Sequence, residues 1–190
     1  MPLNIPNLLT WLRIVLIPVF VAVFYLPATW IDPHVVNFYA TMIFVVAAVT
    51  DWLDGYLARA LNQMSAFGAF LDPVADKLMV AAALVVLVKL QRVDVGIALI
   101  IIGREIAISA LREWMAGIGK SKNVAVSFIG KLKTTAQMAA ILLLLYHDRV
   151  AGMFNAHAAG TILIYIAAIL TLWSMAYYLK KAWPQIAGQN

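Results

Sequence analysis

Four of the nine acidic residues of this 190-residue chain stand within 26 positions, in two closely spaced pairs. The pairs are Asp51 with Asp54 and Asp72 with Asp76. A spacing of three or four residues places both carboxylates of a pair on one face of a helix. Carboxylate oxygens, in a chain without cysteine and with no histidine nearby, suit hard divalent cations such as Mg²⁺ or Mn²⁺ and disfavour zinc. Four such groups can bracket two ions, an arrangement that promotes displacement at phosphorus.

Small residues accompany these aspartates. Gly55 and Ala58 continue the face of the first pair, and Gly68 lies one turn before the second pair. Glycine within a helix costs about 1 kcal/mol relative to alanine, so these positions need a reason. Either a bulky ligand approaches there, which the neighbouring carboxylates favour, or the helices simply pack closely. Arg59, two turns beyond Asp51, could meet a phosphate group or could only end its helix at the cytoplasmic side.

The elements that carry these residues are predicted to be membrane helices. Hydrophobic residues make up 64% of the chain and charged residues only 12%, about half of the usual share in a soluble domain. Charges this sparse cannot coat a water-facing globule, so most of the chain is expected to face lipid or other helices. The net charge of +5 is explained by basic residues gathered on the cytoplasmic side, and we expect no nucleic-acid partner.

A helix needs about 20 residues to cross the hydrocarbon core, and the apolar runs provide six such segments. They are predicted at roughly 8–26, 35–60, 67–90, 95–116, 131–147 and 157–181. The continuous apolar stretches disfavour a barrel of alternating strands. We therefore predict an all-α, polytopic membrane protein with six transmembrane helices, forming a single integral-membrane domain over residues 1–190.

Six spans place both termini on one side of the membrane. That side carries nine basic residues and the opposite side three. The nine are Arg59, Lys77, Arg112, Lys120, Lys122, Lys131, Lys133, Lys180 and Lys181. Because basic residues are concentrated in cytoplasmic loops, both termini are expected in the cytoplasm.

The aspartates and the small residues together resemble the signature of the CDP-alcohol phosphotransferase family. Residues 51–59 read DWLDGYLAR, and the remaining glycine and two aspartates follow at Gly68, Asp72 and Asp76. All eight signature positions match with the expected gaps. Three further segments, NIPNLLTWLR at 4–13, GREIAISALREW at 103–114 and GKLKTTAQ at 130–137, resemble bacterial members of the family.

The resemblance implies roles for these residues. Two divalent cations, Mg²⁺ or Mn²⁺, would be held by Asp51, Asp54, Asp72 and Asp76. Asp76 would also act as general base on the attacking hydroxyl. The cytidine nucleotide of CDP-diacylglycerol would be bound by Gly55, Ala58, Arg59 and Gly68. Polar residues that open the first helix, Asn7 and Thr10, would extend that pocket, as would Arg13, which could instead extend to the membrane interface.

The acceptor would be recognised by the second half of the chain. Its basic residues are Arg104, Arg112, Lys131 and Lys133. A basic cluster beside an acidic metal site would orient an acceptor that carries its own phosphate, and sn-glycerol 3-phosphate fits. These residues could instead be ordinary loop charges, although Arg104 lies well inside a predicted helix. Glu105 is expected to pair with arginines rather than to take part in the chemistry.

The expected reaction is therefore transfer of a phosphatidyl group from CDP-diacylglycerol to sn-glycerol 3-phosphate, which releases CMP. The resemblance also implies a homodimer in the bacterial inner membrane with its active site near the cytoplasmic face. One alternative is the same chemistry with another acceptor, such as inositol phosphate. A cation-coupled membrane transporter would explain the buried carboxylates, but it would not explain the glycine spacing or the arginines beside them.

Overall fold

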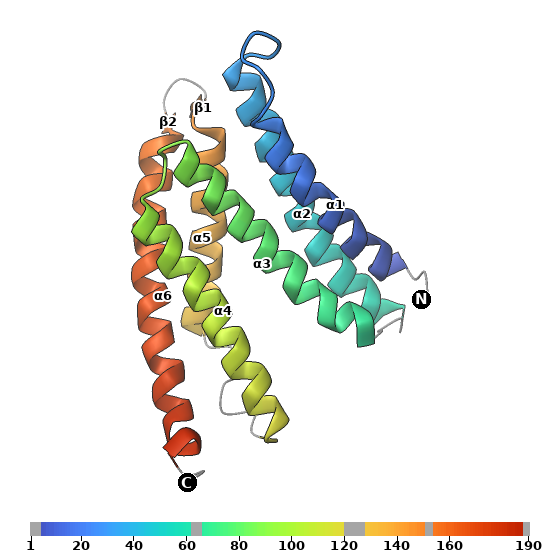
Figure 1. The fold of residues 1–190 in the computed structure, drawn as a ribbon, viewed down its shortest axis with the longest axis vertical. Coiled ribbons are helices and arrows are strands. Elements are labelled where there is room, and N and C mark those ends of the chain that lie inside the picture. The colour runs from blue at the N-terminus through green and yellow to red at the C-terminus, as the bar shows by residue number, and fades with distance from the viewer. Residues whose placement is uncertain (1–4, 62–65, 120–127, 151–153, 188–190) are drawn as a thin grey trace.

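The computed structural model describes residues 5–61, 66–119, 128–150 and 154–187. Within these residues the chain forms six helices and one short antiparallel strand pair (Figure 1). The helices are α1 (Ile5–Val23), α2 (Pro33–Ala60), α3 (Ala66–Lys89), α4 (Val95–Gly117), α5 (Phe128–Tyr146) and α6 (Ala156–Ala187), and the strands are β1 (Arg149–Val150) and β2 (Phe154–Asn155). The prediction of a helical fold is confirmed.

The predicted helix bounds agree with these within three residues, except at the end of the last helix. The first helix spans 5–23 where 8–26 was expected, because Phe24 and Tyr25 leave the helix in turns that precede Pro27. A residue before proline is disfavoured in helical conformation, which stops the helix short of it. The last helix continues past its two lysines to Ala187.

Local sequence explains where several helices begin and end. The carboxylate of Asp32 accepts a hydrogen bond from the backbone N–H of His34 at 2.7 Å, so it caps α2 directly before Pro33. Asp94 caps α4 in the same way. Gln91 follows α3 in the left-handed region, with φ of 56°, and the N–H of Arg92 then bonds the carbonyl of Leu87. These are features of a Schellman end.

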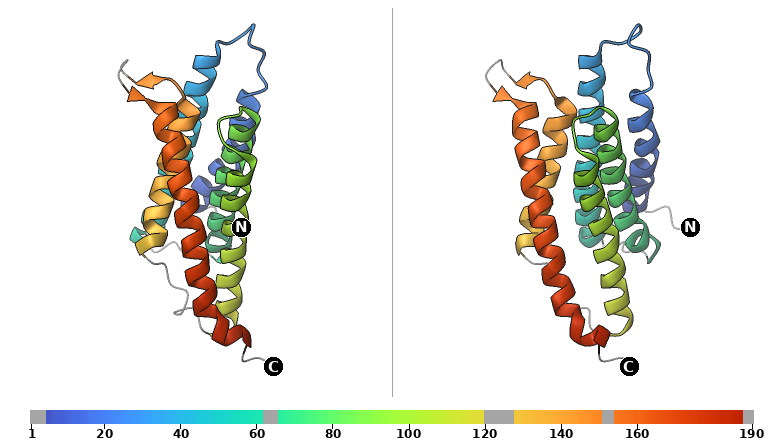
Figure 2. Two further views of the ribbon diagram at one scale, coloured as in Figure 1. Left: turned by 90° about the vertical axis from the view of Figure 1, so that its left-hand side faces the viewer. Right: turned by 60° about the vertical axis from the view of Figure 1, so that its left-hand side comes forward.

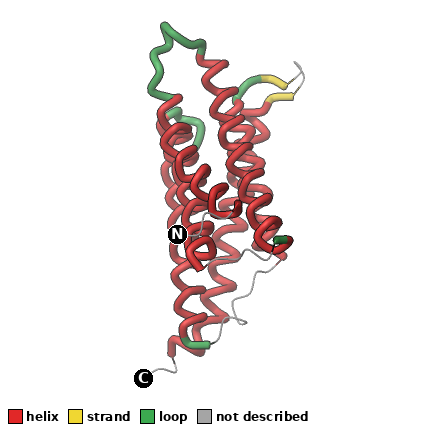
Figure 3. The backbone as a smooth tube through the Cα atoms, turned by 90° about the vertical axis from the view of Figure 1, so that its right-hand side faces the viewer, coloured by secondary structure: helices red, strands yellow, loops and turns green. Residues whose placement is uncertain are grey.

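The helices form two groups of three that pack side by side (Figures 1 and 2). In the first group, α1 packs on both α2 and α3; in the second, α6 packs on both α4 and α5. The groups meet where α2 contacts α5 and where α3 contacts α4. The turns after α1, α3 and α5 lie at one end of the bundle, and the two chain ends lie toward the other (Figures 1 and 3).

The interior between the groups is apolar. Its fully buried side chains include Phe20, Phe44, Leu84, Ile141 and Leu144, which come from α1, α2, α3 and α5. A second, smaller cluster joins α4 to α6 and centres on Ile108, Met115, Tyr178 and Ala182. Both clusters hold the helix faces together and leave the charged residues described below near the end of the bundle that carries the termini.

Two helices of the described part are long and apolar enough to cross a membrane, over Pro33–Ala58 and Ala156–Pro184. Shorter apolar stretches lie at Asn7–Val23 and Leu132–Tyr146. Large apolar side chains are exposed on the outside of the bundle, among them Val85, Leu99 and Ile169. Outward-facing apolar residues on long apolar helices are typical of a protein in contact with lipid.

Candidate active site

The two pairs of aspartates lie on neighbouring antiparallel helices. Asp51 and Asp54 are in the last third of α2, and Asp72 and Asp76 are in the first half of α3. Both segments border the short connection between the two helices, so the pairs meet at the same end of the bundle. This is the juxtaposition that the sequence spacing predicts.

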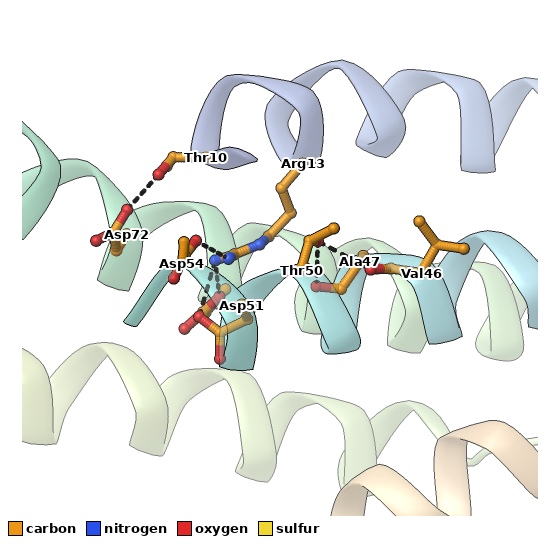
Figure 4. A network of polar contacts seen from close by, with 9 residues as sticks. Thr10, Arg13, Val46, Ala47, Thr50, Asp51, Asp54 and Asp72 are labelled. Carbon is orange, nitrogen blue, oxygen red and sulfur yellow. Dashed lines mark hydrogen bonds and ion pairs between the residues drawn. The ribbon is translucent and has the colours of Figure 1, made fainter. Parts of the chain in front are cut away.

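Arg13 of α1 lies at the centre of the aspartates (Figure 4). Its Nη1 atom is 3.0 Å from Asp51 Oδ1, its Nη2 atom is 2.5 Å from Asp54 Oδ2, and Nη1 also contacts Asp76 Oδ1. The Arg13 side chain is only 1% exposed. The alternative in which Arg13 extends to the membrane interface is therefore wrong for this structure: the guanidinium turns inward because three carboxylates neutralise it there.

The fourth aspartate contacts α1 through a hydroxyl. Thr10 donates a hydrogen bond to Asp72 Oδ1 at 2.5 Å (Figure 4). Asn7, Thr10 and Arg13 are spaced by three residues and all three are buried, so they form one face of α1 that turns toward α2 and α3. The structure thus brings the polar opening of the first helix against the signature aspartates.

The other predicted nucleotide-binding residues lie along the same two helices. Gly55 and Ala58 are half-buried on α2, in the two turns that follow Asp51. Gly68 is buried in the first turn of α3. Arg59 belongs to α2, but its side chain is outside the described part of the structure.

The aspartates have the donor chemistry of a divalent-cation site. Hard oxygen ligands converge from two helices on one positively charged group, which here is the Arg13 guanidinium. Among the residues that the structure describes, no three His, Cys, Asp or Glu side chains surround a common point as a metal cage. The residue types and their convergence on a positive charge fit such ions.

A second charged cluster lies in the other group of helices. Arg104 of α4 donates to Ser174 Oγ of α6 at 3.0 Å, and Arg112 donates to the Tyr178 hydroxyl at 3.2 Å. The two guanidiniums also lie 5.7 and 5.1 Å from the centre of the Tyr178 ring. Hydrogen bonds and cation–π contacts thus hold both arginines against α6.

Lys133 of α5 joins this cluster through an acidic residue. Its Nζ atom contacts Glu105 Oε1, which is also 3.7 Å from Arg104 Nη1. Lys133 is 2% exposed, so its charge is balanced inside the bundle rather than by solvent. Glu105 was expected to pair with arginines; its nearer partner is this lysine, because α5 brings the ammonium group closer. The side chain of Lys131 lies outside the described part.

A cavity of about 370 Å³ connects the two clusters. The aspartate side contributes Arg13, Asp51 and Asp76 to its lining. The side of the basic cluster contributes Glu105, Thr134 and Gln137. A molecule in this cavity can therefore contact Asp51 and Asp76 on one side and Glu105, the partner of Lys133, on the other. Arg104, Arg112 and Lys133 lie behind this lining rather than in it.

Some of these contacts were not predicted. Arg13 was considered only as pocket wall or interface residue, yet it is the only charged residue among the first 31 and the aspartates need a counter-charge. Ser174 and Tyr178 were missed as partners of the arginines. Their spacing of four residues, with Thr171 one turn earlier, places three buried polar groups on one face of an apolar helix. That pattern predicts a polar or charged partner for this face of the helix.

Comparison with known proteins agrees with the motif. The profile of the CDP-alcohol phosphatidyltransferase family matches residues 3–173. The chain is 53% identical over 192 aligned positions, covering both chains completely, to the CDP-diacylglycerol–glycerol-3-phosphate 3-phosphatidyltransferase of Escherichia coli strain K12. Proteins of the same description from Shigella sonnei strain Ss046 and Shigella flexneri serotype 5b are similar to the same extent. Through the signature that its aspartates form and this match along nearly its whole length, the chain belongs to the CDP-alcohol phosphatidyltransferase family.

Proposed function

We propose that this chain is a CDP-diacylglycerol–glycerol-3-phosphate 3-phosphatidyltransferase, which forms phosphatidylglycerol phosphate and CMP. The full-length identity of 53% to proteins of that description supports the assignment. The structural observation that carries it is the cavity that reaches from Asp51 and Asp76 to Glu105, which contacts Lys133 of the basic cluster. A reaction between a pyrophosphate donor and a phosphorylated acceptor requires the aspartate half and the basic half of the site to meet at one reacting phosphorus.

The donor occupies the half of the site formed by α1, α2 and α3. Two divalent cations are held by Asp51, Asp54, Asp72 and Asp76, which requires Arg13 to exchange its present contacts. The nucleotide lies against Asn7, Thr10, Gly55, Ala58, Arg59 and Gly68. Small residues on α2 and α3 leave room for the cytidine, and the partly buried hydrogen bond from Thr10 to Asp72 supports this arrangement.

The acceptor occupies the half formed by α4, α5 and α6. Its phosphate is bound by Arg104, Arg112, Lys131 and Lys133. Charge-assisted hydrogen bonds to phosphate are among the stronger polar contacts in proteins, and guanidinium groups can form them in pairs. The hydrogen bonds from the arginines to Ser174 and Tyr178 support this role, because they fix the orientation of the guanidiniums before the ligand arrives.

The chemical step is a displacement at phosphorus. An acceptor hydroxyl oxygen forms a bond to the phosphorus that carries the diacylglycerol, and the bond from that phosphorus to the CMP oxygen breaks. Asp76 takes the hydroxyl proton as general base, and CMP leaves with the bonding electrons. Divalent cations, when bound, supply positive charge that stabilises the pyrophosphate and the departing CMP.

The membrane setting is part of the proposal. All six helices span the bilayer as one domain of residues 1–190, with both termini and the active site at the cytoplasmic face of the bacterial inner membrane. The excess of basic residues at the end that carries the termini supports this orientation. The exposed apolar side chains support contact with lipid. The protein acts as a homodimer, as the family resemblance suggests.

The test is a product assay on the purified protein in detergent. With CDP-diacylglycerol, sn-glycerol 3-phosphate and Mg²⁺, we expect equal amounts of CMP and of a lipid that carries two phosphates. Chelation of Mg²⁺ should abolish both products. Inositol phosphate, serine and phosphatidylglycerol, offered in parallel, should be poor acceptors. Absence of CMP release with every acceptor would contradict an enzyme and favour the cation-coupled transporter.

A further inference from the structure

One buried polar group in the cavity has no role in the chemistry described above. Gln137 of α5 is 3% exposed and lines the cavity between the two charged clusters. Its amide oxygen has no hydrogen-bond donor within reach among the described residues. A buried acceptor atom without a partner is costly and therefore uncommon in native structures, so its presence in a substrate cavity points to a ligand that donates to it.

The position of Gln137 indicates which substrate that ligand is. It follows Lys133 by four residues on the same buried face of α5, about 6 Å farther along the helix axis. Asp76 lines the same cavity from α3. Glu105, the partner of Lys133, also lines this cavity. A molecule whose phosphate displaces Glu105 from Lys133 and whose attacking hydroxyl is directed at Asp76 therefore passes next to the Gln137 amide.

sn-Glycerol 3-phosphate offers one group for this contact. Its phosphate is bound by the basic cluster, and its terminal hydroxyl is the nucleophile. The hydroxyl on the central carbon is the remaining hydrogen-bond donor, and it lies between the two. We infer that Gln137 is a specificity-determining residue whose amide oxygen accepts a hydrogen bond from the central hydroxyl of the acceptor. This inference rests on the proposed function.

The contact orients the acceptor as well as binding it. A three-carbon chain held only at its phosphate can rotate and present its terminal hydroxyl in several directions. A second fixed point on the central carbon restricts that rotation and keeps the terminal hydroxyl near Asp76. An acceptor that lacks the central hydroxyl leaves the buried amide unpaired, and a site built for a hydroxyl discriminates against such an analogue.

The experiment compares two acceptors and two proteins. The acceptors are sn-glycerol 3-phosphate and 3-hydroxypropyl phosphate, which lacks only the central hydroxyl. We expect the wild type to prefer the first by about 10- to 100-fold in kcat/KM, the range for one buried hydrogen bond. Gln137→Met, similar in size but unable to accept this bond, should lose about the same factor with sn-glycerol 3-phosphate. It should change less than about threefold with the analogue.

Leu142→Met is the matched control, since it lies on the same helix outside the cavity lining and should keep the wild-type preference. Gln137→Asn retains the amide on a shorter side chain and should give an intermediate preference. If the wild type uses both acceptors within a factor of about two, the inference is wrong whatever the variants do. An equal loss with both acceptors in Gln137→Met also overturns it, because a structural role predicts that result. A wild type that makes no product from sn-glycerol 3-phosphate contradicts the proposed function itself.

Discussion

The two charged clusters of this protein are built as opposites of each other. In the group of α1, α2 and α3, aspartates surround one arginine, Arg13. In the group of α4, α5 and α6, cationic side chains approach one carboxylate, Glu105. Each central residue carries the charge sign of what its cluster is proposed to bind, a metal ion in one case and a phosphate in the other. The central residues balance the charge of each cluster inside an apolar bundle, and under the proposed function the bound ligand would replace them.

The clusters differ in how firmly their outer members are held. Asp51 and Asp76 are 45% and 42% exposed, so part of each carboxylate remains open beside the cavity. Lys133 is almost fully buried, and the arginines are fixed by Ser174 and Tyr178. This difference agrees with the proposed roles, in which the aspartates exchange Arg13 for cations and the basic residues bind one phosphate.

The largest effect is expected at the aspartates. Asp72→Asn keeps the size of the side chain and removes its charge, so a metal ligand is lost with little change in packing. We expect turnover to fall below a tenth of wild type while the protein still inserts and folds. The measurement is CMP release at saturating substrates over a range of Mg²⁺ concentrations.

Asp148→Asn is the control for that substitution. Asp148 is an aspartate in the turn after α5, at the opposite end of the bundle, where it pairs with His34. It should retain wild-type turnover. Should Asp72→Asn keep more than a tenth of the activity with unchanged Mg²⁺ dependence, the metal assignment is incorrect.

The next effect concerns the residue at the centre of the aspartates. Arg13→Met leaves the buried Asp54 without its counter-charge, and loss of one partner of a buried ion pair costs about 3–5 kcal/mol. Because a cation can then neutralise the carboxylates without displacing an arginine, Mg²⁺ should raise the melting temperature of this variant more than that of the wild type. Thermal unfolding with and without Mg²⁺ measures both quantities.

Arg92→Met is the control: it tests whether loss of an arginine elsewhere in the bundle also increases the effect of Mg²⁺ on the melting temperature. Arg92 donates to the carbonyls of Leu144 and Leu145 at the far end of the bundle, so its loss should lower stability without a special response to Mg²⁺. If Mg²⁺ stabilises Arg13→Met no more than the wild type, then Arg13 and the ions do not share the aspartate site.

The sequence predicted the aspartate half better than the basic half. Spacings of three and four residues are fixed by the helix itself, so the shared faces of α2 and α3 followed from the chain alone. The contacts of Arg104 with Ser174 and of Lys133 with Glu105 depend on how three helices pack. The polar face of Thr171, Ser174 and Tyr178 could be found from the sequence, but which cations it contacts depends on that packing.

The Arg13 contacts show the same limit within the better-predicted half. Its charge and its helix were evident, but a position beside the aspartates and a position at the interface are both compatible with the sequence. The choice depends on the rotation of α1 about its axis. That rotation follows from the packing of Phe20 against Phe44 and the rest of the core, which the structure supplies.

A smaller effect is expected when each half of the site is tested with its own substrate, the acceptor for the basic half and the donor for the aspartate half. Lys133→Ala removes a charge-assisted contact of about 1.5–3 kcal/mol, so kcat/KM for sn-glycerol 3-phosphate should fall roughly 10- to 150-fold. Binding of CDP-diacylglycerol, measured without acceptor, should barely change. Arg59→Ala should do the reverse and weaken donor binding. Titrations that vary one substrate at a time measure both variants, and loss of affinity for the same substrate in both would contradict the division of the site.

The smallest effect is expected at the centre of the basic cluster. Glu105 contacts Lys133, so the acceptor phosphate has to compete with its carboxylate for that ammonium group. Glu105→Gln keeps the shape of the side chain and removes the competing charge. We expect the KM for sn-glycerol 3-phosphate to fall about two- to tenfold, which corresponds to one ordinary hydrogen bond, with kcat nearly unchanged. Glu113→Gln, an exposed position on the same helix, is the control and should leave KM unaltered.

A higher KM in Glu105→Gln would mean that the carboxylate positions Lys133 for the phosphate instead of competing with it. In that case Arg13 and Glu105 are not equivalent, and only the aspartate cluster exchanges its central charge for a ligand.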